Sequence, residues 1–129
     1  MEIIGIGNAI VDILSKCDDA LLDSLKLEKG TMQLVDEQQA ASIYKAIGPT
    51  TEVSGGSVAN SCAILANLGI STGFVGAVAD DTFGNIFTHD LNSIGVKNLF
   101  RPEERSLPTA TSIVLVTPDA QRTMNTHLG

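Results

Sequence analysis

A pair of adjacent glycines at the start of a helix-forming run is the feature that most constrains this chain. Gly55 and Gly56 follow the β-branched Val53 in the stretch VSGGSVANSCAILANL, which has apolar residues at helical spacing and stops at Gly69. Glycines at such a junction predict a strand-to-helix turn in which the backbone comes close to another group. The turn is therefore a candidate site for a ligand.

The residues around this turn suit a polyhydroxylated ligand. We expect Ser54 or Ser57 to cap the helix, whose first amides face the turn. Asn60, about one helical turn further on, carries two hydrogen-bond donors and an acceptor. The alternative is structural, because Gly55 and Gly56 could serve only to pack the helix tightly on a sheet.

The first residues of the chain supply a second candidate site. Residues 2–7 (EIIGIG) form a short apolar run that predicts a buried first strand. Asn8 and Asp12 come at or just past its end, where parallel sheets place ligands, so Asp12 is expected to accept hydrogen bonds from sugar hydroxyls. A turn asparagine and a solvated aspartate are the alternative. The two glycines of the run begin a dinucleotide-binding fingerprint, but Ile10 replaces the third, which disfavours an NAD-binding oxidoreductase domain.

The rest of the chain predicts alternating strands and helices, followed by strands alone. Helices are expected over residues 18–25 and 37–47, from the glycine pair to residue 68, and from Asp80 or Asp81 to residue 94. Strands are expected over 31–35, 72–77, 98–101, 110–117 and 121–126. Asp36, and either Asp80 or Asp81, are the expected helix caps. The order strand–helix–strand–helix over 53–94 predicts a parallel sheet covered by helices. Residues 118–120 (PDA) predict a hairpin turn in a small sheet covered on both sides.

Composition narrows the classes of function. The 129 residues are enough for one domain with a core. The net charge is −7 and basic residues do not cluster, which disfavours nucleic acid as a partner. The chain has no apolar run long enough for a membrane and no basic leader at its start, so we expect no membrane association and a cytoplasmic location. Cys17 and Cys62 fit reduced thiols, and His89 and His127 have no metal-ligand context, so no metal site is expected.

Four motifs in order resemble the N-terminal part of a PfkB-type, ribokinase-like carbohydrate or nucleoside kinase. They are GIGNAIVDI at 5–13, SGGSVANS at 54–61, GAVADDTFG at 76–84 and PTATSIVLVTPDAQRTMN at 108–125. The spacing GGSxxNS and the ending RTMNTHLG look more like the adenosine-kinase branch. The resemblance implies an α/β fold, with a partial parallel sheet and flanking helices in a core (1–13 and 53–96) and a small β lid (14–53 and 97–128).

The resemblance also implies substrate-binding roles. Asp12 would bind hydroxyls of a sugar or ribose, Asn8 would shape the same pocket, and Gly55, Gly56 and Asn60 would line its floor. Side chains of the lid would cover the substrate and pack on the base of a nucleoside; they are Ile10, Met32, Leu34, Ser112 and Met124. For Met32 and Met124 the alternative is ordinary core filling.

The implied reaction is transfer of a phosphoryl group from ATP to a substrate hydroxyl, with Mg²⁺ and a monovalent cation as further candidates. The family takes its base from an aspartate in a late DTxGAGD motif, which this sequence lacks, and no P-loop replaces it. We therefore expect a fragment of a longer kinase that has no catalytic residue of its own, lacks most of the ATP site and is inactive alone.

Two further expectations concern partners. Arg122 matches a family arginine near the lid hairpin; without the resemblance it reads as a solvated hairpin residue. An unpaired sheet edge or the lid could support a homodimer. A non-catalytic module that binds a small ligand or a partner remains the alternative to a kinase.

Overall fold

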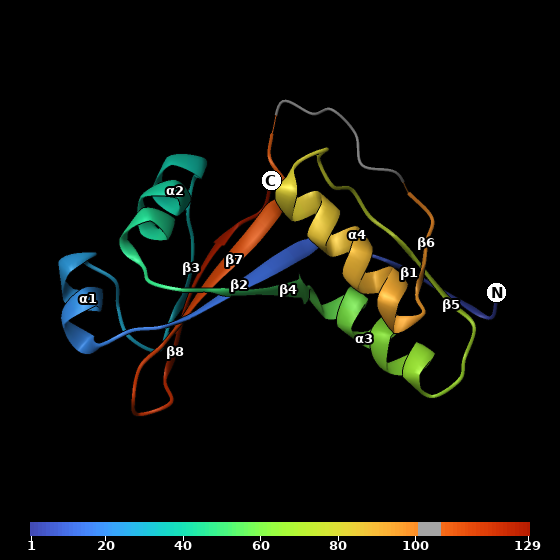
Figure 1. Cartoon of the computed structure of the whole chain (residues 1–129), viewed down its shortest axis with the longest axis horizontal. Coiled ribbons are helices and arrows are strands. Elements are labelled where there is room, and N and C mark those ends of the chain that lie inside the picture. The colour runs from blue at the N-terminus through green and yellow to red at the C-terminus, as the bar shows by residue number, and fades with distance from the viewer. Residues whose placement is uncertain (101–106) are drawn as a thin grey trace. The chain divides into compact units, whose positions relative to one another are not determined.

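The computed structural model describes residues 1–100 and 107–129, and after the first strand its elements alternate between strands and helices from β2 as far as residue 98 (Figure 1). In chain order they are β1 Ile3–Ile6, β2 Ile10–Lys16, α1 Asp19–Ser24, β3 Met32–Leu34, α2 Glu37–Ala46, β4 Thr51–Gly55, α3 Ser57–Asn67, β5 Thr72–Val75, α4 Thr82–Ile94, β6 Lys97–Asn98, β7 Ala110–Val116 and β8 Arg122–His127. Arg101, the last residue of the strand expected at 98–101, lies outside the described residues. No described helix has the length and apolar character needed to cross a bilayer.

The chain divides into two compact units. The first comprises Met1–Val11, Val53–Ala110 and Gly129, and the second comprises Asp12–Glu52 and Thr111–Leu128. Lys97–Asn98, which the sequence grouped with the lid, pairs with β5 in the first unit. Each unit is built around its own group of strands.

The first unit contains the parallel sheet β1-β5-β6, on which α3 packs. Phe74 of β5 and Phe87 of α4 are fully buried, with ring centroids 5.6 Å apart. Asp81 caps α4, as the sequence predicted, by accepting a hydrogen bond from the Gly84 amide at 2.7 Å. The helix ends at Gly95, whose left-handed backbone (φ 96°) favours glycine.

Two sequence predictions about this sheet are wrong. The first strand is not buried, because Ile3, Ile4 and Ile6 are 38%, 54% and 75% exposed. Among the described residues β1 pairs only with β5, so its other edge has no partner strand. The strand at residue 53 does not join the strand at 72–77 either, since β4 belongs to the other sheet, at its edge beside β2.

The predicted cap of the central helix is also wrong. Gly56 is the N-cap residue of α3, and no side chain makes a capping hydrogen bond there. Ser54 lies in β4, where its amide donates to Asp90 Oδ2 at 2.8 Å, and Ser57 is already the first residue of the helix. Neither serine occupies the N-cap position, so neither side chain accepts a hydrogen bond from the first amides of α3.

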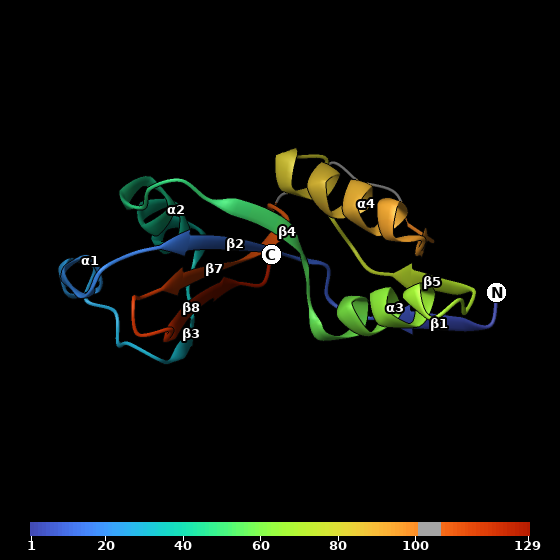
Figure 2. The same ribbon diagram turned by 60° about the horizontal axis from the view of Figure 1, so that its bottom comes forward.

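The second unit carries most of a five-stranded mixed sheet of order β3-β8-β7-β2-β4. Figure 2 shows β2, β7, β8 and β3 side by side in this order. The hairpin β7–β8 is antiparallel, as predicted, whereas β3 runs parallel to β8. α2 packs against β8 and buries Ile43. Asp36 closes a capping box with Gln39 at the start of α2, which confirms the predicted cap.

Candidate functional site

The glycine turn of the first unit is a close approach between two backbone segments. Gly56 has φ 95°, and a Cβ atom at this position would lie 2.7 Å from the carbonyl oxygen of Asn8. A side chain is therefore excluded both by backbone conformation and by space. The sequence correctly predicted a close backbone approach, and the neighbouring group is the chain's own loop between β1 and β2.

Polar side chains surround this turn. Asn8 and Asn60 are both exposed, and neither side chain makes a hydrogen bond to another described residue. The Asn60 amide donates to the Gly56 carbonyl at 2.9 Å, so the amides that precede it in α3 remain open at the helix start. Gly55 is the buried last residue of β4. The first unit thus offers two amide side chains and uncapped helix amides in one region of its surface.

The Gly-x-Gly of the first strand has a packing role. A Cβ atom on Gly5 would lie 2.5 Å from Cys62 Sγ, and one on Gly7 would lie 2.8 Å from Val58 Cβ. The two glycines therefore allow α3 to pack directly on β1. The following segment is strand β2, not the helix that a dinucleotide-binding turn requires.

Asp12 lies inside a strand and not past the end of one, which corrects its predicted place. It is the third residue of β2, on which Val11, Ile13 and Ser15 are buried while Ile10, Asp12 and Leu14 are half-buried. Alternate residues of a strand point to opposite faces. Ile10 and Asp12 therefore share the less covered face of β2.

The other predicted lid residues lie on this same face of the five-stranded sheet. Met124 of β8 pairs with Met32 of β3 and with Val114 of β7. Directly paired residues present their side chains on the same face. Val116 alternates with Val114 along β7, and it lines one pocket together with Leu14, which alternates with Asp12. The residues that alternate with these, Val11 and Ile13 on β2 and Ile113 and Leu115 on β7, are at most 1% exposed. Asp12 and Val114 therefore lie on the less covered side of their strands.

The next row across the sheet joins Ser112, Thr126 and Leu34. Ser112 pairs with Thr126, which pairs with Leu34. The hydroxyls of Ser112 and Thr126 are 3.0 Å apart and hydrogen-bonded. We call the whole set the ligand face; it consists of Ile10, Asp12, Leu14, Met32, Leu34, Ser112, Val114, Val116, Arg122, Met124 and Thr126.

The apolar side chains at the β3 edge of the ligand face are exposed. Met32 and Leu34 are 56% and 65% exposed, and Met124 is half-buried. Core filling is therefore the wrong interpretation of Met32. Exposed apolar side chains can pack on a ring, and the Asp12 carboxyl, which lies on the same face three strands away, can accept hydrogen bonds from hydroxyls.

Asp12 and Arg122 are the two charged residues in the set defined as the ligand face. Burial raises the pKa of the Asp12 carboxyl above its ordinary value of 3.8, while the charge of Arg122 acts in the opposite direction. Arg122 is exposed and alternates with Met124 along β8. The oxygens of an aspartate carboxyl can accept hydrogen bonds from hydroxyl groups.

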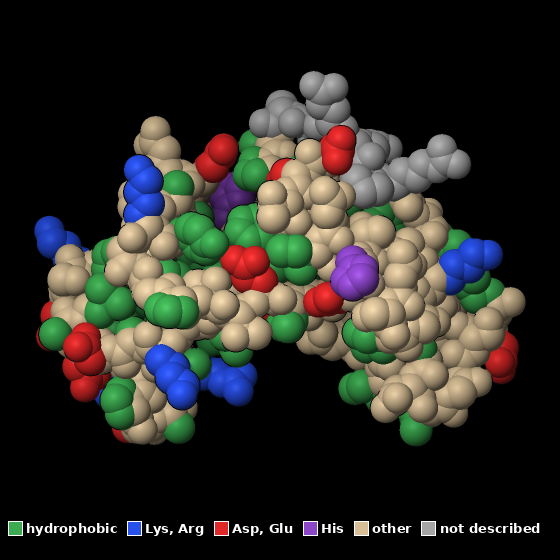
Figure 3. Space-filling view, in the orientation of Figure 1, with side chains coloured by type: hydrophobic (Ala, Val, Ile, Leu, Met, Phe, Trp, Pro, Cys, Tyr) green, Lys and Arg blue, Asp and Glu red, His purple; other side chains and the backbone are tan. Residues whose placement is uncertain are grey.

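Sequence reasoning missed several members of the ligand face, namely Leu14, Val114, Val116 and Thr126. The available signal was the period of two along β2 and along the hairpin, combined with the short turn at residues 118–120 that fixes its register. On the molecular face shown in Figure 3, lysine and arginine side chains are scattered.

The donor set of the described residues does not match a metal centre. Within residues 1–100 and 107–129, no three His, Cys, Asp or Glu side chains gather as metal ligands.

Comparison with known proteins identifies the family. The profile of the pfkB family carbohydrate kinases matches residues 31–129. The chain belongs to this family. No curated protein sequence matches the chain.

Solved structures of similar fold are kinases of the same type. A probable sugar kinase protein from Rhizobium etli CFN 42 is 44% identical with a TM-score of 0.88, over 99% of this chain and 39% of that one. The adenosine kinase from Sinorhizobium meliloti gives the same four values. Adenosine kinase from Schistosoma mansoni, solved in complex with adenosine in an occluded loop conformation, is 25% identical with a TM-score of 0.82, over 99% of this chain and 38% of that one. The fold is thus α/β and ribokinase-like, and the chain spans about two fifths of these relatives.

Proposed function

We propose that this chain supplies the substrate-binding surfaces of an ATP-dependent kinase that phosphorylates a hydroxyl of a nucleoside such as adenosine. The observation that carries the proposal is the ligand face, where Asp12 shares one side of a sheet with the exposed Met32 and Leu34. A sugar alone would use the carboxylate and leave the apolar groups without a partner. The adenosine kinases among the similar structures support the same choice.

Each part of the surface has a role in this proposal. The Asp12 carboxylate accepts hydrogen bonds from ribose hydroxyls, and the apolar side chains of Met32, Leu34 and Met124 pack on the base. Ile10 and Ser112 complete the cover, while Asn8, Asn60 and the Gly55–Gly56 turn bind the remaining polar groups of the substrate.

The transfer itself requires groups that this sequence does not contain. ATP supplies the phosphoryl group, Mg²⁺ offsets its charge, and a base takes the proton of the attacking hydroxyl. We assign the base, the metal, any monovalent cation and most of the ATP site to the part of the longer relatives that this chain does not span. The 129 residues therefore bind a substrate without turning it over.

The test is calorimetric titration of the chain with adenosine, ribose and fructose. We expect adenosine to bind most tightly, because it alone presents both hydroxyls and an apolar ring system. Asp12→Asn should weaken adenosine binding about 10-fold or more, since it removes a charged acceptor. Asp23→Asn, on the exposed side of α1, is the matched control and should change nothing. Equal affinity for ribose and adenosine would contradict the role of the apolar groups.

A second experiment tests the lack of turnover. The purified chain is incubated with ATP, Mg²⁺ and adenosine, and the products are separated by chromatography. We expect no phosphorylated nucleoside. Phosphorylation above the rate of the buffer alone, and dependent on protein concentration, would overturn the assignment of the base outside this chain.

A further inference from the structure

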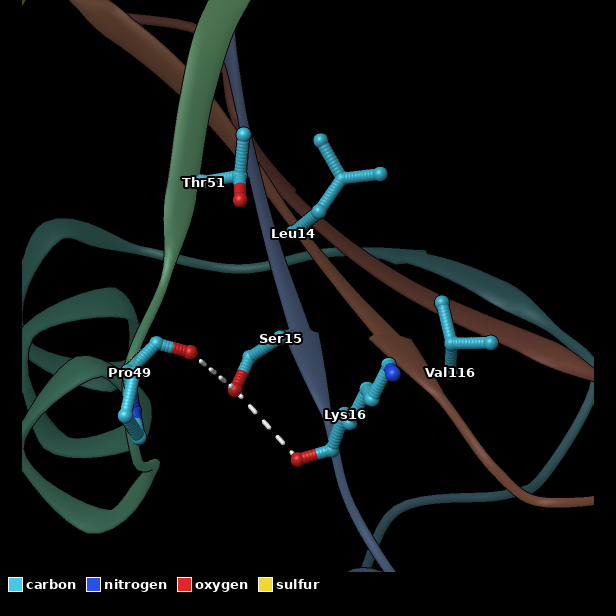
Figure 4. A pocket seen from close by; sticks show the side chains of 6 residues that line it. All are labelled: Leu14, Ser15, Lys16, Pro49, Thr51 and Val116. Atoms are coloured by element: carbon cyan, nitrogen blue, oxygen red, sulfur yellow. Dashed lines mark hydrogen bonds between the residues drawn. The ribbon is translucent and has the colours of Figure 1, made fainter.

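A pocket of about 410 Å³ lies at the far end of β2, within the second unit (Figure 4). Leu14, Ser15 and Lys16 of β2 line it together with Val116 of β7 and with Pro49 and Thr51. Pockets that bind small organic ligands have volumes of roughly 300–1,000 Å³. The cavity therefore has room for one ring and a polar group.

The wall of this pocket is fixed by a buried serine. Ser15 is 4% exposed, and its hydroxyl donates to the carbonyl oxygens of Pro49 at 3.2 Å and of Lys16 at 3.4 Å. Figure 4 shows Ser15 turned toward Pro49 and away from Val116. The bond joins the segment before β4 to the end of β2, so the pocket is built into the sheet.

The lining combines an apolar interior with a free cation at its rim. Leu14, Val116 and Pro49 present carbon atoms, and Thr51 adds one hydroxyl. The Lys16 side chain is exposed and extends toward Val116 in Figure 4; none of the described carboxylates forms an ion pair with it. Val116 also pairs with Arg122 on β8, which adds a second positive charge to this end of the sheet.

The opposite charges of Asp12 and Lys16 on β2 determine how a bound anion is oriented in the pocket. Asp12, Leu14 and Lys16 alternate on one face and are spaced by about 7 Å per pair of residues. A negative group placed over Leu14 is repelled by Asp12 on one side and attracted by Lys16 on the other. An occupant therefore has its apolar part against Leu14 and its anionic end toward Lys16.

We propose that this pocket binds a small amphiphilic anion, with an aromatic or branched alkyl body against Leu14, Val116 and Pro49 and a carboxylate directed at Lys16. The pocket shares Leu14 and Val116 with the ligand face, while its other lining residues, Ser15, Lys16, Pro49 and Thr51, lie outside it. Binding of an anion there does not depend on the proposed kinase function.

The test compares three probes by ¹H–¹⁵N NMR titration of the 129-residue chain. Benzoate has both the ring and the charge, benzyl alcohol has the ring alone, and acetate has the charge alone. We expect benzoate to bind about three-fold more tightly than benzyl alcohol, as for an exposed ion pair, with the difference shrinking at high salt. Acetate should produce no saturable shift. The shifted amides should include those of Ser15 and Thr51.

Three variants assign the two interactions to residues. Lys16→Gln should make benzoate and benzyl alcohol bind equally, and Lys45→Gln, an exposed lysine of α2, should leave the difference intact. Val116→Thr, which keeps the side-chain shape, should weaken both ring probes. Equal affinity of the two ring probes for the unmodified chain, or an undiminished preference for benzoate in Lys16→Gln, would overturn the proposal. Adenosine titration of the same samples reports separately on the proposed function.

Discussion

At the scale of single residues, Gly56 is a position at which both the backbone conformation and the neighbouring atoms exclude a side chain. Gly56→Ala places a Cβ atom 2.7 Å from the Asn8 carbonyl oxygen on a residue with φ 95°. We expect a loss of about 1–3 kcal/mol in the free energy of unfolding, measured by urea denaturation.

Gly48 provides the matched control for this substitution. A Cβ atom at Gly48 meets nothing within 4 Å, and its φ is not in the left-handed region. Gly48→Ala should therefore leave the free energy of unfolding unchanged or raise it slightly. If both variants lose the same free energy of unfolding, the close approach to the Asn8 carbonyl oxygen is not the reason that position 56 requires glycine.

The Asp12 carboxylate, which we propose binds ribose hydroxyls, lowers the stability of the folded chain. Burial raises its pKa above 3.8, so the folded chain holds the protonated form more readily than the unfolded chain does. The ionised carboxylate therefore lowers stability above the folded-state pKa, and this loss disappears as the pH falls below 3.8.

This sign gives a direct prediction for Asp12→Asn. At pH 7 the variant should be more stable than the unmodified chain by less than about 1 kcal/mol, because solvent screens a half-buried group. The gain should vanish when thermal unfolding is repeated at acidic pH. Asp23→Asn should show no such dependence, and a destabilised Asp12→Asn at neutral pH would contradict the argument.

At the scale of elements, the start of α4 depends on one of two adjacent acids. Asp81 accepts hydrogen bonds from the Gly84 amide, the Thr109 amide and the Thr109 hydroxyl, at 2.7, 3.0 and 2.7 Å. It thereby joins the helix to the residue just before β7. Asp81→Ala should cost about 1–2 kcal/mol, as the loss of a helix cap does.

Asp80→Ala is the control for the cap, because Asp80 is exposed and precedes the N-cap position. We expect it to be neutral in thermal unfolding followed by circular dichroism. Since Thr109 is buried, Asp81→Ala should also weaken the packing of residues near 109. A larger effect from Asp80→Ala would reverse the assignment of the cap.

The elements themselves were predictable from local signals. Asp18, Asp36 and Asp81 each begin a helix, Gly95 ends one, and the turn at 118–120 closes the hairpin. These signals act over a few residues, so sequence alone contains them. The placement of Asp12, Met32 and Met124 on one face, in contrast, required the register of β3 and β8.

The failures have a common physical cause. Nothing near Val53 reveals that β4 pairs at the edge beside β2, because strand pairing is a long-range choice. The apolar run of β1 predicts burial, yet burial depends on what covers the strand, which no local pattern records. The serines beside Gly56 are good cap residues by type, but the turn geometry assigns the N-cap position to the glycine.

At the scale of the whole molecule, the exposed strand β1 predicts self-association. Ile4 and Ile6 lie on one face of β1 and are 54% and 75% exposed, and β1 has a partner on one side only within the described residues. An open edge with apolar side chains is a template for pairing with another copy of the chain. We expect sedimentation equilibrium to show an average mass that rises with concentration above that of one chain.

The substitution Ile6→Lys tests this edge directly. A charge on the exposed face opposes both strand pairing and apolar contact, so the variant should remain monomeric at concentrations where the unmodified chain associates. Ile64→Lys is the control, because Ile64 is 63% exposed but belongs to helix α3 and has no place in a strand. If both variants reduce association equally, apolar surface in general is responsible. If the unmodified chain is a monomer throughout, the edge of β1 does not drive association, and the homodimer expectation for this surface fails.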